Sequence, residues 1–142
     1  MKVRFKKLSP GAIIPTRATP QAAGLDLYSL DDVALRSGST LVISTGVAME
    51  LPWGFEGQIR SRSGLSTKGV HVLNSPGTID SDYRGELKVI LHNSNSLLPH
   101  YIRAGDRIAQ LVIAPVTLAE PEEVVELTGT LRDSGGLGST GT

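Results

Sequence analysis

Residues 40–51, TLVISTGVAMEL, carry the clearest secondary-structure signal in this 142-residue chain. β-branched and other apolar residues fill the run, which is typical of an extended strand. Gly46 interrupts it, and a glycine inside a strand pattern indicates a bulge or a bend. The stretch therefore predicts one long strand that bends near its middle.

Shorter runs of the same kind lie on both sides of it, with breakers such as Ser-Pro-Gly and Pro-Trp-Gly between them. They cover residues 3–6, 25–28, 33–35, 55–61, 70–73, 87–93 and 107–116. Only residues 63–68 suggest a helix, of one or two turns. Short strands separated by turn signals predict an all-β domain, either a sandwich, a jelly roll or a barrel.

Composition excludes several classes of protein. The 14 basic and 14 acidic residues balance, so no overall charge predicts a nucleic-acid or membrane partner. The chain has no cysteine, which excludes disulfides and cysteine zinc sites, and its three histidines show no metal-ligand spacing. Without a signal peptide or a membrane-length apolar run, the sequence predicts a soluble, cytoplasmic protein.

The composition changes near residue 128, which predicts a domain over residues 1–127 and a glycine-rich arm over residues 128–142, TGTLRDSGGLGSTGT. Such a segment is typical of a disordered tail. Flexible backbone, hydroxyl groups and one arginine also suit a flap that closes over phosphates. Both interpretations stay open at this level.

Four further stretches combine glycines with charge: AGLDL at 23–27, SRSGL at 61–65, GTIDSDYRGEL at 77–87 and GDRIAQLV at 105–112. Each also has a plain structural interpretation, as a strand entry, a helix cap or a hairpin. SRSGL suits an anion, because free amides point outward at a helix start. Together the stretches supply arginines, hydroxyls and carboxylates that suit a phosphate ester with a divalent cation.

In this order, the four stretches and the arm RDSGGLGSTG resemble the five motifs of the trimeric deoxyuridine triphosphatases (dUTPases). The resemblance implies a distorted jelly roll of the β-clip type, in a homotrimer with a swapped C-terminal arm and active sites between subunits. It also implies hydrolysis of dUTP to dUMP and pyrophosphate, which keeps uracil out of DNA and supplies dUMP for thymidylate synthesis. The expected ligands are dUTP and Mg²⁺, and neither nucleic acid nor membrane is expected as a partner.

The resemblance also assigns roles to residues. Asp80 would activate the water that attacks the α-phosphorus, Ser63 would contact the α–β bridge, and Tyr83 would lie under the deoxyribose and exclude a 2′-hydroxyl. Asp26 would reach Mg²⁺ through a water, with the phosphates as the main ligands. The substrate-binding set is Arg62, Ser63, Gly64, Asn74, Gly77, Ile79, Asp80, Tyr83, Lys88, Gln110, Arg132, Leu137, Gly138, Ser139 and Thr140.

The arm departs from the family pattern at two positions. Leu137 replaces the aromatic residue that stacks on uracil, and Asp133 adds a negative charge after Arg132. Base–aromatic stacking contributes about 1–3 kcal/mol. We therefore expect a working but weaker lid, unless local repacking compensates for the change.

Two other functions remain compatible with parts of the sequence. A dCTP deaminase has the same fold but relies on a catalytic glutamate in a different third motif. A non-catalytic dUTPase-like binding protein is the other alternative, and only Leu137 favours it. Asp80, Tyr83, Ser63 and Arg132 favour the hydrolase.

Overall fold

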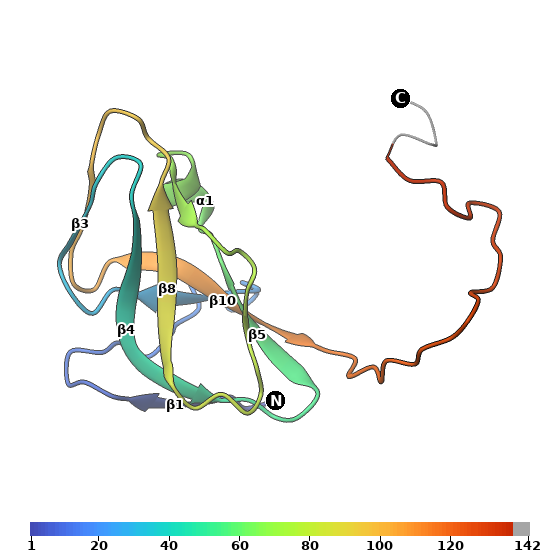
Figure 1. The fold of residues 1–142 in the computed structure, drawn as a ribbon. Helices are drawn as coiled ribbons and strands as arrows, with labels where there is room; N and C mark the ends of the chain where they lie inside the picture. The colour runs from blue at the N-terminus through green and yellow to red at the C-terminus, as the bar shows by residue number, and fades with distance from the viewer. Residues whose placement is uncertain (138–142) are drawn as a thin grey trace.

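The computed structural model describes residues 1–137 and confirms an all-β chain (Figure 1). Its elements are β1 (Arg4–Lys7), β2 (Leu25–Tyr28), β3 (Val33–Leu35), β4 (Thr40–Glu50), β5 (Phe55–Arg60), α1 (Ser63–Ser66), β6 (Val70–Val72), β7 (Gly77–Ile79), β8 (Glu86–Asn93), β9 (His100–Ile102) and β10 (Arg107–Pro115). The arm residues 138–142, and with them the predicted contacts of Gly138, Ser139 and Thr140, lie outside the described residues.

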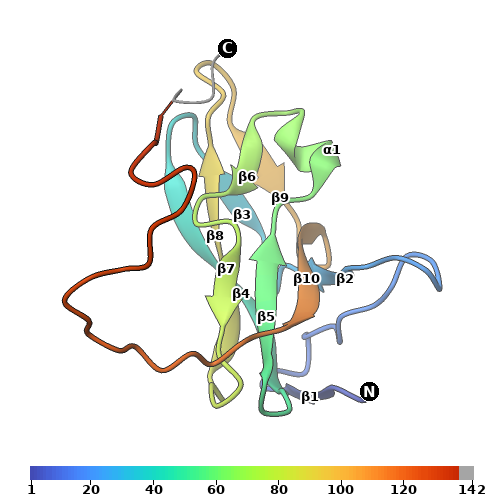
Figure 2. The same cartoon turned by 90° about the vertical axis from the view of Figure 1, so that its right-hand side faces the viewer.

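The strands form two four-stranded sheets and a small two-stranded one, all antiparallel. One large sheet has the order β1-β4-β8-β6, and the other has the order β2-β10-β5-β7 and faces the viewer in Figure 2. Neighbours in each sheet are mostly distant in sequence, as expected for a jelly-roll-like fold. The predicted fold class is confirmed.

The hydrophobic core lies between the sheets and is built by alternation along the strands. In β8, Leu87, Val89 and Leu91 are fully buried while the residues between them are exposed or half-buried. Burial of each such side chain contributes about 1.5–3 kcal/mol. Leu27 of β2 and Leu111 of β10 are fully buried in the same core, so both large sheets rest on it.

The predicted bend in β4 occurs at Gly46. This residue has a φ of 68°, and the pairing of β4 with β8 shifts register between Ser44 and Ala48. A Cβ atom at Gly46 would lie 2.9 Å from the Cβ atom of Ala12, so a side chain has neither the conformation nor the space. The bulge lets one strand follow the curvature of the sheet.

Two strands, β7 and β9, were not predicted. Each has three residues and depends on a partner strand, β5 for β7 and β3 for β9. Gly77 has a low intrinsic strand preference and three residues show no usable period, so pairing with β5 rather than a local pattern defines β7. The remaining strand ends agree with the prediction to within one residue.

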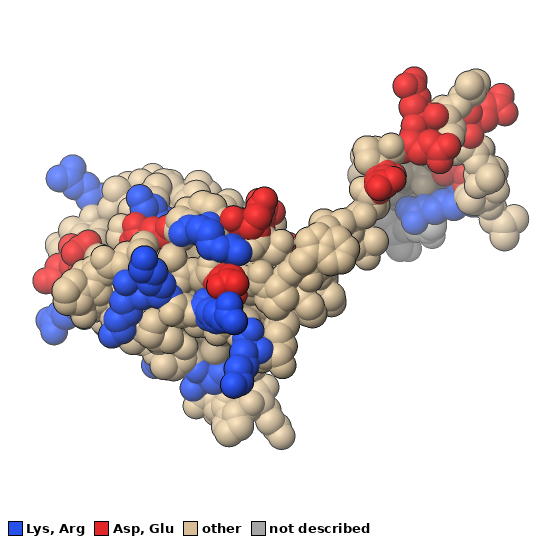
Figure 3. Space-filling view, turned by 90° about the horizontal axis from the view of Figure 1, so that it is seen from below, with Lys and Arg blue, Asp and Glu red and all other residues tan. Residues whose placement is uncertain are grey.

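The chain leaves the folded body after β10 (Figure 1). Within the part of this tail that the structure describes, residues 116–137, there is no helix or strand. Seen from below, Lys and Arg side chains gather on the body, and Asp and Glu side chains gather on the tail (Figure 3). Over residues 1–137 the structure contains no helix with the length and apolarity needed to cross a membrane.

Candidate active site

Three of the predicted motifs meet at one end of the sheet β2-β10-β5-β7. The Asp26 carboxylate, with only 12% of its side chain exposed, forms an ion pair with Arg62, whose Nε lies 3.1 Å away, and accepts a hydrogen bond from Arg107 Nη1 at 3.3 Å. Arg62 Nη1 also donates to the Arg107 carbonyl at 3.0 Å. One carboxylate thus holds two guanidinium groups side by side. The three side chains together carry one net positive charge, which is available to attract an anion.

Gln110 completes this group, which we call the arginine cluster: Asp26, Arg62, Arg107 and Gln110. It lies directly opposite Asp26 in the pairing of β10 with β2, and its Nε2 donates to the Ser61 carbonyl at 2.8 Å. Gly24 gives it space, because a Cβ atom there would lie 2.5 Å from Gln110 Oε1. The glycine of the first motif therefore positions the glutamine of the fourth.

The loop after β5 brings further polar groups to the arginine cluster. Arg62 is the N-cap of the four-residue helix α1, and its carbonyl accepts from the amides of Leu65 and Ser66. The first amides of a helix have no acceptor within the helix. Ser63 and Gly64, both exposed, occupy those first positions beside Arg62. This arrangement of amides, a hydroxyl and a guanidinium suits phosphate oxygens.

The third motif forms a turn between β7 and β8 in which Tyr83 is held in place. Its amide donates to the Asp80 carbonyl at 3.2 Å, and its hydroxyl donates to the Glu86 carbonyl at 3.0 Å. The ring lies against Gly85, where a Cβ atom would be 2.5 Å from the ring carbon Cζ. Only glycine at position 85 permits this placement of the ring.

A hollow lies beside this turn, and Asp80 is at its rim. The residues that line it are Thr78, Ile79, Asp80, Tyr83, Glu86 and Lys88. Asp80 is exposed, whereas the Lys88 ammonium lies 3.7 Å from a Glu86 carboxylate oxygen. We call Asp80, Tyr83 and Lys88 the hairpin group.

β7 is an edge strand, which matters for recognition. Its partner is β5, and in the part of the chain that the structure describes no strand pairs with its other side. Backbone N–H and C=O groups on that side are therefore free to form hydrogen bonds with the edge of a planar ligand. Asn74 is next to this strand: a Cβ atom at Gly77 would lie 3.1 Å from the Asn74 amide nitrogen.

The arginine cluster and the hairpin group do not meet within one chain. Along the sheet, Asp26 is paired with Gln110, which is paired with Arg60 of β5, so these three residues form one row across the strands. Asp80 lies one residue beyond Ile79, which is paired with Gly57 of β5, so Asp80 belongs to a different row. The two rows are about 13 Å apart along the strands, and β2 and β7 are about 14 Å apart across the sheet. Asp80 is thus about 20 Å from Asp26.

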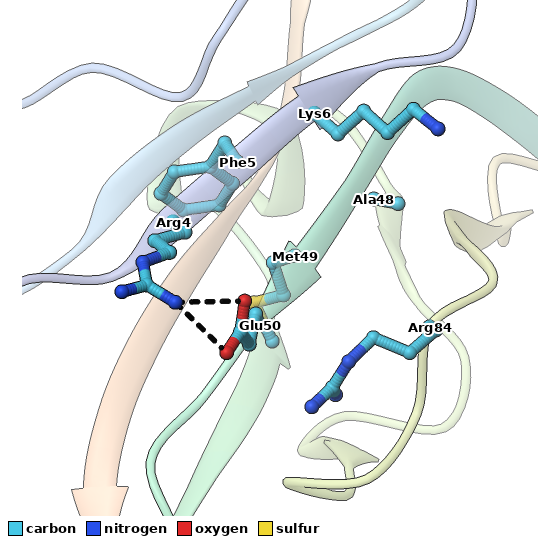
Figure 4. Close-up of a pocket in the computed structure, with 7 residues that line it drawn as sticks. All are labelled: Arg4, Phe5, Lys6, Ala48, Met49, Glu50 and Arg84. Carbon is cyan, nitrogen blue, oxygen red and sulfur yellow. Dashed lines mark hydrogen bonds and ion pairs between the residues drawn. The ribbon is translucent and has the colours of Figure 1, made fainter.

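The described part of the arm reaches neither group. Arg132 Nε donates to the Gly135 carbonyl at 2.9 Å in a local turn, and Leu137 is completely exposed. Another hollow, between β1 and β4, contains no predicted site residue (Figure 4). Its Arg4 guanidinium lies 3.2 Å from the Glu50 carboxylate, and Arg84 lies on its far side.

No role was predicted for Arg107, Gly24 or Gly85 from the sequence. All three lie in the quoted motifs, so the motif strings contained the signal. Their roles depend on contacts between strands, which no string of residues shows. Among residues 1–137, no group of three or more His, Cys, Asp or Glu side chains is arranged to hold a metal ion.

Comparison with known proteins gives one consistent result. A model of the dUTPase family matches residues 11–141. The deoxyuridine 5′-triphosphate nucleotidohydrolase of Nautilia profundicola is 54% identical over 143 residues, which cover 99% of this chain and 99% of that protein.

Solved structures agree with the sequence comparison. The dUTPase of Staphylococcus bacteriophage 80alpha with dUpNHpp has a TM-score of 0.93 at 31% identity and covers 99% of both chains. A variant of the dUTPase of phage phi11 of S. aureus, whose structure reports a structural Mg(II) ion, has a TM-score of 0.83 at 28% identity and covers 91% of this chain.

Proposed function

The chain belongs to the dUTPase family and hydrolyses dUTP to dUMP and pyrophosphate, and from this premise we propose how its residues divide the reaction. The family match favours the hydrolase over a deaminase or a binding protein without catalysis. The observation that carries the proposal is the distance of about 20 Å between Asp80 and Asp26. Neither the arginine cluster nor the hairpin group is a complete site, so one active site takes the cluster from one copy of the chain and the hairpin from another.

Asp80 is the base in this scheme. Its carboxylate takes a proton from a water as the water oxygen bonds to the α-phosphorus. The bond from the α-phosphorus to the bridging oxygen breaks, and its electron pair leaves with pyrophosphate. Ser63, from the neighbouring copy, donates a hydrogen bond to that bridging oxygen, where negative charge develops. Positioning and charge stabilisation, rather than covalent chemistry, account for most of the rate.

The arginine cluster holds the phosphates together with Ser63 and Gly64. Without substrate, Asp26 neutralises much of the charge of Arg62 and Arg107. When a triphosphate arrives, the guanidinium groups turn to its oxygens, because phosphate offers them bidentate partners. This exchange releases the Asp26 carboxylate from its ion pairs. The site therefore gains a free hydrogen-bond acceptor when the negatively charged triphosphate binds.

Mg²⁺ fits this set of residues only if the substrate supplies most of its ligands. Among residues 1–137 no group of three or more His, Cys, Asp or Glu side chains could hold the ion, and Mg²⁺ typically retains several waters and binds substrate phosphates. Asp26, once released from its arginines, would accept a hydrogen bond from one of those waters. Mg²⁺, when bound, would neutralise charge on the phosphates, and Asp26 would orient that water.

The edge of β7 and the turn between β7 and β8 recognise the nucleoside. The free edge of β7, between Gly77 and Ile79, hydrogen-bonds the uracil edge, and Asn74 contacts the same base. The Tyr83 ring, fixed by its bond to Glu86, lies under the deoxyribose and leaves no space for a 2′-hydroxyl. Lys88 borders the same hollow and contributes positive charge toward the phosphates.

We propose that the assembly is a homotrimer, a closed ring in which every copy gives its hairpin group to one neighbour. The tail extends from the body, which suits an arm that reaches another copy (Figure 1). There Arg132 clamps the γ-phosphate, Leu137 covers the base, and Gly138, Ser139 and Thr140 add phosphate contacts. Cytoplasmic location remains a prediction.

A mixing experiment tests the shared site. We expect the Asp80→Asn and Ser63→Ala chains to be inactive when each is refolded alone, and the two are then unfolded and refolded together in equal amounts. Random assembly gives intact Ser63 and intact Asp80 in about a quarter of the shared sites, so about a quarter of wild-type activity returns. Each variant refolded alone is the control. No recovery from a mixture that forms trimers by size would refute the shared site, although not the hydrolysis itself.

A further inference from the structure

Two histidines face each other on the outer side of the sheet β1-β4-β8-β6. His71 of β6 and His92 of β8 are directly opposite in the strand register. Their ring centroids are 5.4 Å apart, and the ring planes make an angle of 68°. Both side chains are half-buried, so the strands and their neighbours restrict the rotamers. The pair takes no part in the proposed reaction.

The separation of the rings fits a shared metal ion. Metal–nitrogen bonds to imidazole are about 2.0 Å long, and a ring centre lies about 1.2 Å behind its nitrogen. Two imidazoles bound at a tetrahedral angle therefore have their centroids about 5 Å apart. The separation of 5.4 Å is close to this value, and the rings turn from their edge-to-face arrangement to direct one nitrogen each at the same ion.

A third strand supplies the orienting contact that metal-binding histidines usually have. Thr40 of β4 is opposite His92 in the register, and its Oγ1 lies 3.0 Å from His92 Nδ1. When Nδ1–H donates to this hydroxyl, Nε2 carries the lone pair and is free to bind a metal. His71, His92 and Thr40 thus form one row across three neighbouring strands.

The surroundings of the row do not oppose a cation. Two residues further along the strands, Val42 pairs with Ile90, which gives an apolar neighbourhood. The nearest charged position on this face of β8 is Lys88, four residues from His92 and thus about 13 Å away. The nearest acid on this face of β8 is Glu86, six residues from His92 and thus about 20 Å away, so it does not compete for the metal as an oxygen ligand.

We propose that His71 and His92 form a binding site for a borderline transition-metal ion such as Cu²⁺, Ni²⁺ or Zn²⁺. Imidazole nitrogens suit these ions, whereas Mg²⁺ prefers oxygen ligands, so the pair is distinct from the magnesium of the reaction. Residues 1–137 hold no arrangement of three or more such ligands, so the chain supplies two and water fills the other positions. Cu²⁺ binds most tightly within this series.

The test uses the full-length untagged protein with Cu²⁺ and no nucleotide. Electron paramagnetic resonance of the bound ion is expected to show nitrogen coupling from two imidazoles, at one Cu²⁺ per chain by calorimetry. His71→Asn and His92→Asn should each weaken binding at least about tenfold, and Thr40→Val should weaken it less. His100→Asn is the matched control, because it removes the third histidine and should leave the affinity unchanged.

The outcomes separate cleanly. Coupling to fewer than two imidazoles in the wild-type protein would overturn the proposal, whatever the variants do. Equal affinity in wild type, His71→Asn and His92→Asn would also overturn it, as would a loss caused by His100→Asn alone. Hydrolysis of dUTP with Mg²⁺ confirms that each variant is folded, since none of these residues belongs to the proposed active site.

Discussion

Gly85→Ala tests whether Tyr83 selects the sugar. The new Cβ atom would lie 2.5 Å from Tyr83 Cζ, where ordinary contact begins at about 3.4 Å. The turn between β7 and β8 is otherwise unchanged by one methyl group, so the ring must move by about 1 Å or more. The movement also breaks the hydrogen bond from the Tyr83 hydroxyl to Glu86, which contributes about 0.5–1.5 kcal/mol.

The expected effect falls on discrimination rather than on stability. A displacement of about 1 Å in a positioning group lowers the rate by up to about 100-fold. We expect kcat/KM for dUTP to fall by between about 10-fold and 100-fold, and kcat/KM for UTP to stay constant or rise, because the 2′-hydroxyl gains space. The ratio between the two substrates therefore falls at least about tenfold.

Steady-state pyrophosphate release from dUTP and UTP measures this ratio. Gly11→Ala is the matched control, since a Cβ atom there meets Leu30 at 3.5 Å, an ordinary contact far from the turn. Tyr83→Phe separates the two causes, because it removes the hydrogen bond and leaves the ring. An unchanged ratio in a folded Gly85→Ala protein would show that Tyr83 does not select the sugar.

Three further substitutions test the other roles. Asp80→Asn should abolish turnover and preserve dUTP binding by calorimetry; retained turnover would contradict its role as base. Leu137→Phe should lower KM for dUTP about fivefold through base stacking, and an unchanged KM would show that the lid does not depend on an aromatic residue. Asp26→Asn removes both ion pairs and should lower unfolding free energy in urea by about 1–2 kcal/mol, less than for a fully buried pair because Arg62 and Arg107 reach solvent. It should also weaken the dependence of the rate on Mg²⁺, and a wild-type response to Mg²⁺ would refute the role of Asp26.

Local patterns were enough to predict most strands. The bend at Gly46 and the alternation of β8 follow from residue types alone, because burial requires a period of two. β7 and β9 could not be predicted in this way, because three residues give no usable period and pairing with a distant strand defines them. The strand pattern thus gave the all-β class, and the order of the strands came only from the structure.

For the candidate site too, some features could be predicted from the sequence and others required the structure. Motif strings identified Asp26, Arg62 and Gln110, which the structure brings together. They did not identify Arg107 as the second partner of Asp26, because that ion pair depends on the register between β2 and β10. A sequence motif also gives no distance in space. The separation of Asp80 from the arginine cluster therefore became known only from the order of the strands in the sheet.

The ion pair between Asp26 and Arg107 joins residues 81 positions apart, and this has a consequence for how the protein matures. β2 cannot pair with β10 until nearly the whole chain has left the ribosome. Contacts between distant residues form slowly, because a long loop must close before any of them stabilises the chain. The arginine cluster is therefore among the last parts to form, and recovery of catalysis after denaturation should lag behind formation of the more local pairing of β5 with β7.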